Sequence, residues 1–148
     1  MKAICLHPIS YKPYYMHKGL LRTGAITALL AVALGAFGAH GLKKLVEPES
    51  VAVFDTGVRY QVYHAIAILI TGILFHHFPN KKILYAGYFF LAGIILFSGS
   101  LYLLTFFKAQ GVVGMSGIGI ITPIGGLMFL TGWLLMVLGI SRSESAIP

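Results

Sequence analysis

Charged residues divide this chain into long apolar blocks. Four stretches contain no Asp, Glu, Lys or Arg: residues 23–42, 60–80, 83–107 and 109–141. Each is at least as long as the ~20 apolar residues that cross a bilayer core as an α-helix. The stretches are apolar on all sides and do not alternate as the strands of a membrane barrel would. The pattern therefore predicts an all-α membrane protein, a bundle of four transmembrane helices.

The fourth stretch is too long for one span. Its first part, residues 109–119, is rich in glycine and indicates a loop. Thr122 and Pro123 then predict a helix start, because threonine can cap a helix and proline at the first helical position loses no hydrogen bond. Residues 123–141 would form the span, about 28 Å long at ~1.5 Å per residue.

A further helix is predicted to start at Pro48, between the first two spans. Glu47 and Glu49 lie near its positive end, and proline favours the first helical position. This helix either lies at the membrane interface as a short separate element or runs straight into the second span. In both cases Asp55 and Arg59, four residues apart with the acid first, share one helix face.

The chain is divided by this pattern into one membrane domain and two tails. We expect the four-helix membrane domain to cover residues 18–142, with an N-terminal tail of residues 1–17 and a C-terminal tail of residues 143–148. The N-terminal tail holds two prolines and three tyrosines without an apolar period, so we expect it to be poorly ordered. Met16 is an alternative start. A cleaved signal peptide is an alternative for the first span, although its apolar run exceeds the usual ~7–15 residues.

Composition and charge support insertion into a membrane. Hydrophobic residues make up 57% of the chain and charged residues 10%, whereas a soluble domain is about 25% charged. The net charge of +7 comes from basic residues at the ends of apolar blocks, so we expect no nucleic-acid partner. Seven Lys and Arg residues fall on the side of the termini and four on the other side. This difference predicts cytoplasmic termini.

Five polar residues near one end of the first two spans are the candidate site. They form a candidate intramembrane polar cluster of His40, Asp55, Arg59, Gln61 and His64. Polar groups at this depth are costly unless paired, so they are functional candidates by default. Three interpretations remain open. The residues could hydrogen-bond to one another as a structural network, the histidines could relay protons, or His40, His64 and Asp55 could hold a metal, although no clear third ligand supports that. The prediction is no metal and no cofactor.

Small residues form the second candidate set, because they let helix backbones approach closely in lipid. We expect helix packing at Ala31, Gly35, Gly38, Ala39, Gly99, Gly125 and Gly126. A substrate path lined by backbone is the alternative, but no cluster of charges accompanies these residues.

Several motifs together resemble a known family. They are ALGAFGAHGLK at 33–43, FDTGVRYQVYHA at 54–65, LFSGSLYLL at 96–104 and ITPIGGLMFLTGWLL at 121–135. In order and spacing they resemble the YgdD-like family of small bacterial integral membrane proteins, which is classed as a domain of unknown function. The resemblance covers about residues 18–142. It implies a four-span plasma-membrane protein, and it supplies no activity, substrate or catalytic residue.

No enzyme motif occurs in the sequence, since it contains no P-loop, nucleophile elbow or HExxH. We therefore expect a multi-pass protein of the bacterial plasma membrane with a non-enzymatic structural or partner-binding role. Its expected partners are the lipid bilayer and either a second copy or another membrane protein. The first alternative is a small transporter or proton-conducting protein that uses His40 and His64. The second is a membrane enzyme acting on lipid or quinone at the same end.

Overall fold

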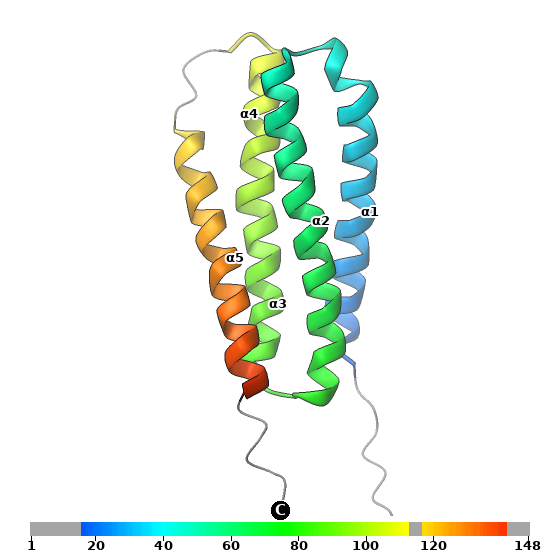
Figure 1. Ribbon diagram of the computed structural model, residues 1–148, viewed down its shortest axis with the longest axis vertical. Helices are drawn as coiled ribbons and strands as arrows, with labels where there is room; N and C mark the ends of the chain where they lie inside the picture. Colours follow the sequence, from blue (N-terminus) through cyan, green and yellow to red (C-terminus); the bar gives the residue numbers. More distant parts are fainter. Residues whose placement is uncertain (1–15, 113–116, 142–148) are drawn as a thin grey trace, which may run out of the picture.

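The computed structural model describes residues 16–112 and 117–141, and every regular element in them is helical. The elements are α1 (Lys18–His40), a 3₁₀ turn (Leu42–Lys44), α2 (Pro48–His77), α3 (Lys81–Gly93), a π-helical segment (Ile94–Ser98), α4 (Gly99–Ala109) and α5 (Ile118–Ser141) (Figure 1). Four helical rods in these residues are long and apolar enough to cross a membrane: Lys18–Lys44, Pro48–His77, Lys81–Ala109 and Ile118–Ser141. The predicted all-α bundle of four spans is confirmed.

One helix boundary differs from the sequence-based prediction, and an alternative left open for another helix is resolved. Helix α5 begins at Ile118, so Pro123 lies inside the helix and the predicted start at residue 123 is wrong. The proline removes only the hydrogen bond to the carbonyl four residues earlier, and this loss falls in the first turns, next to the loop. Helix α2 is continuous from Pro48, so its first turns run directly into the second span and do not form a separate interfacial helix.

Polar side chains cap the starts of two spans. The Asn80 side-chain oxygen accepts hydrogen bonds from the backbone N–H groups of Lys82 and Ile83, both at 3.1 Å. Its amide nitrogen donates to the carbonyl of Gly139 at 3.0 Å, which joins the start of α3 to the end of α5. The His17 ring accepts from the N–H of Leu20 at 3.1 Å. These bonds satisfy N–H groups that the helices leave free at their first turns.

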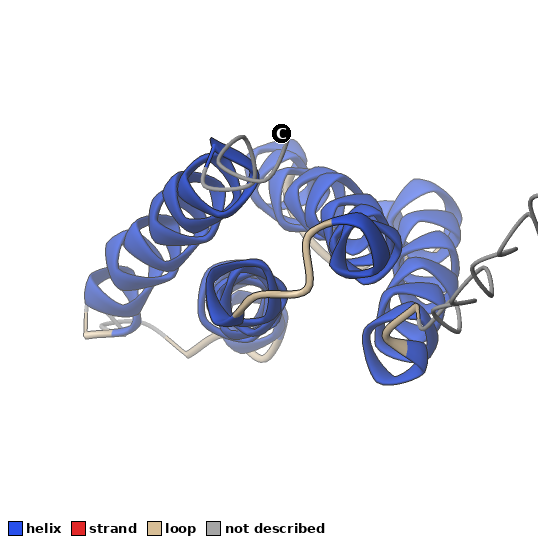
Figure 2. Ribbon diagram, turned by 90° about the horizontal axis from the view of Figure 1, so that it is seen from below, coloured by secondary structure: helices blue, strands red, loops and turns tan. Residues whose placement is uncertain are grey.

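The spans pack in series. Helix α1 packs chiefly on α2 and α5 chiefly on α3, with α2 and α3 in contact between them. Viewed along the helices, α1 and α5 lie on opposite sides of the molecule (Figure 2). One core cluster joins all four spans through Leu20, Ile68, Ile83, Phe90 and Phe129. Their other faces expose large apolar side chains, as expected for helices surrounded by lipid.

Helix α3 and the π-helical segment meet α5 along a seam of glycines with a seven-residue period. Gly125, Gly132 and Gly139 of α5 face Phe97, Phe90 and Ile83, which are also seven residues apart. At one further position the roles are reversed, because Gly93 of α3 faces Phe129 of α5. At Gly93, Gly132 and Gly139 a bulky side chain fills the space that the glycine leaves, and at Gly125 the backbone of Phe97 does so. This seam brings the backbones close, and close packing is what holds helices together in lipid.

The small residues predicted in the first span lie mostly against α2. Ala31 is completely buried, and a Cβ on Gly38 would meet the Phe54 ring at 3.1 Å. Gly35 is half-buried, and a Cβ on it would lie 3.4 Å from Val58. Ala39 is exposed, so it does not belong to this contact.

Two of the remaining predicted packing glycines require correction. A Cβ on Gly99 or Gly126 would meet no atom within 4 Å, so neither residue makes a close helix contact within the chain. Gly125 does, because it lies on the buried side of α5, whereas Gly126 is rotated about 100° around the helix from it. The other glycines of α5 that lie in the seam with Gly125 are Gly132 and Gly139.

Candidate functional site

Gln61 connects three helices. This residue of α2 is only 4% exposed. Its amide nitrogen donates to the carbonyl of Thr27 in α1 at 2.9 Å, and its side-chain oxygen accepts from the hydroxyl of Tyr102 in α4 at 2.8 Å. Both ends of the amide are therefore used in bonds between spans, where no water is available to replace them.

His64 connects α2 to α5. Its Nδ1 lies 2.8 Å from the carbonyl oxygen of Tyr60, and its Nε2 lies 3.3 Å from the indole nitrogen of Trp133. A carbonyl can only accept and an indole N–H can only donate, so Nδ1 carries the proton and Nε2 accepts. This is the neutral imidazole. The ring is 5% exposed and stacks on Phe129 with centroids 3.4 Å apart and planes at 8°.

Two further hydrogen bonds connect α4 to its neighbours. The Ser100 hydroxyl pairs with that of Thr122 in α5 at 2.7 Å, and the Thr105 hydroxyl donates to the carbonyl of Ser50 in α2 at 3.4 Å. Ser98, in the π-helical segment, is completely buried, and its hydroxyl has no hydrogen-bond partner among the described residues. Together with the bonds of Gln61 and His64, these contacts form a set of polar links between the spans.

The five candidate residues do not form the single cluster that the sequence suggested. Gln61 and His64 are buried and bonded to the partners just described, whereas His40 and Arg59 are exposed and Asp55 is half-buried. The spacing along α2 explains the separation, because residues 61 and 64 share the buried face, whereas residue 59 lies about 160° around the helix from residue 61. The described residues contain no group of three or more potential metal ligands, so the alternative metal site is not assembled.

The partners of the buried pair were not identified from the sequence. Thr27 contributes its backbone carbonyl, and because every residue has one, the sequence does not indicate which carbonyl is used. In the sequence, Trp133 and Tyr102 are distinguished only as aromatic residues with a polar tip. The available signal is their type: in a span, the indole N–H and the phenol O–H each need a partner, and polar side chains on neighbouring helices can provide one.

A groove lies beside His64 on the outer side of α2 and α5. Its volume is about 590 Å³, and its lining includes Tyr60, Phe97, Gly126 and Trp133. The missing side chain of Gly126 leaves part of this space open. His64 borders the groove but stays 5% exposed, so the groove presents mainly aromatic and aliphatic surface.

Comparison with known proteins agrees with this architecture. Residues 34–126 match the family described as "Protein of unknown function (DUF423)". The chain belongs to the DUF423 family. The chain is also similar to the "UPF0382 membrane protein YwdK" of Bacillus subtilis (strain 168), 44% identical over 115 residues, with 77% of this chain and 89% of the relative covered.

A second relative comes from Haemophilus influenzae. This "UPF0382 membrane protein" is 40% identical over 121 residues, which cover 82% of this chain and 92% of the relative. No solved structure matches the chain significantly. Both relatives are named as membrane proteins, and this chain has four apolar helices of spanning length, so it is a multi-pass membrane protein. The DUF423 match includes Gln61, His64 and Tyr102 but ends before Trp133.

Proposed function

We propose that this protein is a non-enzymatic structural or partner-binding component of the bacterial plasma membrane. The observation that carries the proposal is the pairing of His64, whose two ring nitrogens are both occupied by hydrogen bonds within the bundle. The amide of Gln61 is likewise bonded at both ends. Buried polar groups used in this way join helices, which is their common role in membrane bundles.

The pairing of His64 argues against proton conduction. A relay must accept a proton and release it, and Nε2 is the only ring nitrogen without a proton of its own, so it is the one that would have to accept. A proton on Nε2 would turn it into a donor facing the Trp133 N–H, another donor, so the bond between α2 and α5 would be lost. His40, the other histidine of that alternative, is exposed at the end of α1 and shares no bond with His64. These arrangements support the structural proposal over a transporter and over an enzyme that uses both histidines.

The experiment compares His64→Ala with His40→Ala in the purified full chain. We expect the His64 variant to unfold at a lower temperature in mild detergent and the His40 variant to match the wild type. In liposomes, we expect the wild-type protein to move protons no faster than protein-free vesicles. A proton flux that His64→Ala abolishes without changing the unfolding temperature would overturn the proposal in favour of transport.

Orientation and partners are part of the same proposal. The excess of Lys and Arg on the side of the termini supports a cytoplasmic location for both ends. The partners of the protein would be the lipid bilayer and either a second copy or another membrane protein. Its sequence motifs support a relationship to the YgdD-like family. In a Cys5→Ser background, a cysteine introduced by Ser143→Cys should resist labelling from outside intact cells. Labelling there would reverse the orientation.

A further inference from the structure

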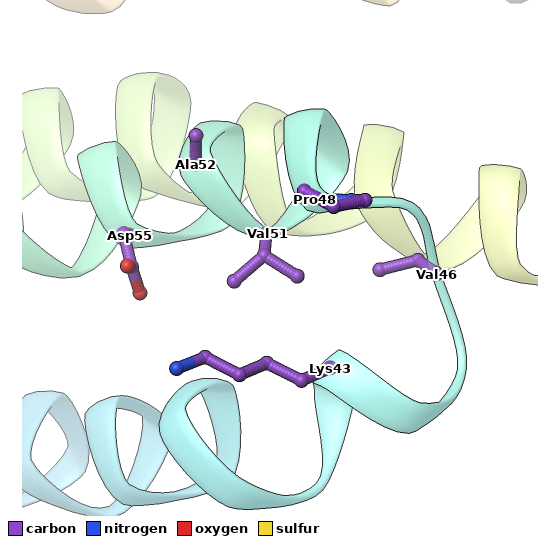
Figure 3. A pocket seen from close by; sticks show the side chains of 6 residues that line it. All are labelled: Lys43, Val46, Pro48, Val51, Ala52 and Asp55. Carbon is purple, nitrogen blue, oxygen red and sulfur yellow. The ribbon is translucent and has the colours of Figure 1, made fainter.

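A charged pocket lies at the end of the bundle where α1 turns into α2. Its volume is about 320 Å³, within the range of ligand sites in proteins. Lys43 lies on one wall and Asp55 on the other (Figure 3). Four apolar residues complete the lining: Val46, Pro48, Val51 and Ala52.

The two charged side chains face each other across the pocket. The Lys43 side chain extends along the pocket toward Asp55 (Figure 3). Asp55 has space because Gly38 lies opposite, where a Cβ would be 3.3 Å from a carboxylate oxygen. Within residues 16–112 and 117–141, neither charged group makes a hydrogen bond or an ion pair. A positive and a negative group are thus held on opposite walls without protein partners.

The pocket lies at the level expected for lipid headgroups. Helix α2 has 30 residues, about 45 Å of helix, which exceeds a hydrocarbon core about 30 Å thick. Its ends therefore extend beyond the hydrocarbon. Asp55 lies about 10 Å from the start of the helix, near the boundary between hydrocarbon and headgroups. Pro48 and Ala52 are exposed beside it, so the pocket opens on the outer surface of the bundle.

We infer that this pocket binds the headgroup of a phospholipid that carries a primary amine, such as phosphatidylethanolamine. The Lys43 ammonium would bind the phosphate, and the Asp55 carboxylate would accept hydrogen bonds from the lipid amine. Val46 and Val51 would contact the glycerol and the first methylenes of the acyl chains. Charge complementarity favours a zwitterionic headgroup, because an anionic one would satisfy only Lys43, and a primary amine can donate hydrogen bonds to Asp55 that a quaternary amine cannot. The inference requires membrane insertion and does not depend on the proposed function.

The experiment measures lipid binding to the full chain in mild detergent by native mass spectrometry. The probes are phosphatidylethanolamine, its N-monomethyl and N,N-dimethyl forms, phosphatidylcholine and phosphatidylglycerol. We expect binding to weaken as methyl groups are added to the amine, because each replaces one of the N–H donors available to Asp55 and adds bulk, until the quaternary amine has none. Lys43→Met and Asp55→Asn should each reduce phosphatidylethanolamine binding at least about tenfold, the equivalent of one charged contact of ~1.4 kcal/mol.

Two matched variants serve as controls. Lys44→Met removes the neighbouring lysine and Glu49→Gln an acid in the first turn of α2; both residues are exposed and neither lines the pocket. We expect both controls to bind lipid like the wild type. Equal losses in control and pocket variants would overturn the inference, since general surface charge would then explain binding. Equal binding of all five lipids would overturn the inference, because the pocket would then not distinguish headgroups. Preference for phosphatidylglycerol would overturn the role of Asp55.

A folding defect in a pocket variant would leave the inference testable. In that case the methylation series on the wild-type chain decides alone. A graded loss of affinity from the primary to the quaternary amine supports the site, and a flat series overturns it. Soluble phosphoethanolamine at the same concentration should fail to displace the lipid, because it lacks the acyl chains. Displacement would assign the pocket to a soluble solute instead.

Discussion

The close approach of α5 to the third span can be tested with two neighbouring glycines. A methyl group added by Gly125→Ala would lie 2.7 Å from the Cα of Phe97, whereas one added by Gly126→Ala would meet nothing within 4 Å. The backbone nitrogen of Phe97 is closer still, and ordinary contact begins at 3.4 Å, so the first change forces the backbones apart by at least roughly 0.7 Å. The backbone of Phe97 cannot rotate away as a side chain could.

The magnitude follows from what the two substitutions share. Both replace glycine by alanine inside α5, and both gain up to about 1 kcal/mol of intrinsic helix preference. Only Gly125→Ala also overpacks the interface, which typically costs about 1–3 kcal/mol. We therefore expect Gly125→Ala to be less stable than Gly126→Ala by about 1–3 kcal/mol. Gly126→Ala itself should equal or exceed the wild type.

Unfolding by sodium dodecyl sulfate in mixed micelles measures this difference. Trp133, the single tryptophan, lies on the same helix and contacts His64 and Phe90, so its fluorescence reports separation of α5. Adding Phe97→Ala should not rescue Gly125→Ala, because the obstructing atoms belong to the backbone. Equal stability of the two glycine variants would refute the close approach and with it the glycine seam.

Three other predictions concern the polar residues. Gln61→Ala removes two hydrogen bonds between helices and should lower the free energy of unfolding by about 1–3 kcal/mol in the same titration. Arg59→Ala changes an exposed residue and should alter it by no more than about 0.5 kcal/mol; equal losses would support the single cluster predicted from the sequence. Trp133→Phe removes the bond to His64 but keeps a ring, and should cost about 0.6–1.7 kcal/mol by circular dichroism; no loss would mean that the bond is not formed. Ser98→Ala removes a buried hydroxyl without a partner, so its unfolding temperature should equal or exceed that of the wild type, and a clear decrease would reveal a partner.

The number and type of the spans could be predicted because one strong constraint determines them. Inside lipid every backbone group must be satisfied within the protein, so an apolar block of sufficient length becomes a helix. The exact start of α5 could not be derived in this way. A start at Pro123 would lose no hydrogen bond, whereas the observed start at Ile118 loses one, so the chemistry of proline alone indicates the later start.

Helix rotation could not be predicted, and it decides which polar residues meet. A span that is apolar on all sides has no polar face to indicate its orientation, so residues close in sequence, such as Arg59 and Gln61, were assigned to one cluster although they face different directions. The seven-residue spacing of Gly125, Gly132 and Gly139 is the signal that could have oriented α5. Once Gly132 is placed opposite Phe90, the next residue of α5, Trp133, also lies beside Phe90.

The same seam explains why His64 is paired. Gly132 lets α5 approach the third span at Phe90, and Gly93 makes room for Phe129, the ring on which His64 stacks. The backbone contact therefore sets the distance at which the Trp133 indole reaches the imidazole. A substitution that separates the helices elsewhere along the seam, such as Gly125→Ala, should therefore also weaken the hydrogen bond between Trp133 and His64. Histidine exchange broadening by NMR in Gly125→Ala but not in Gly126→Ala would reveal this coupling, and identical histidine signals in both would exclude it.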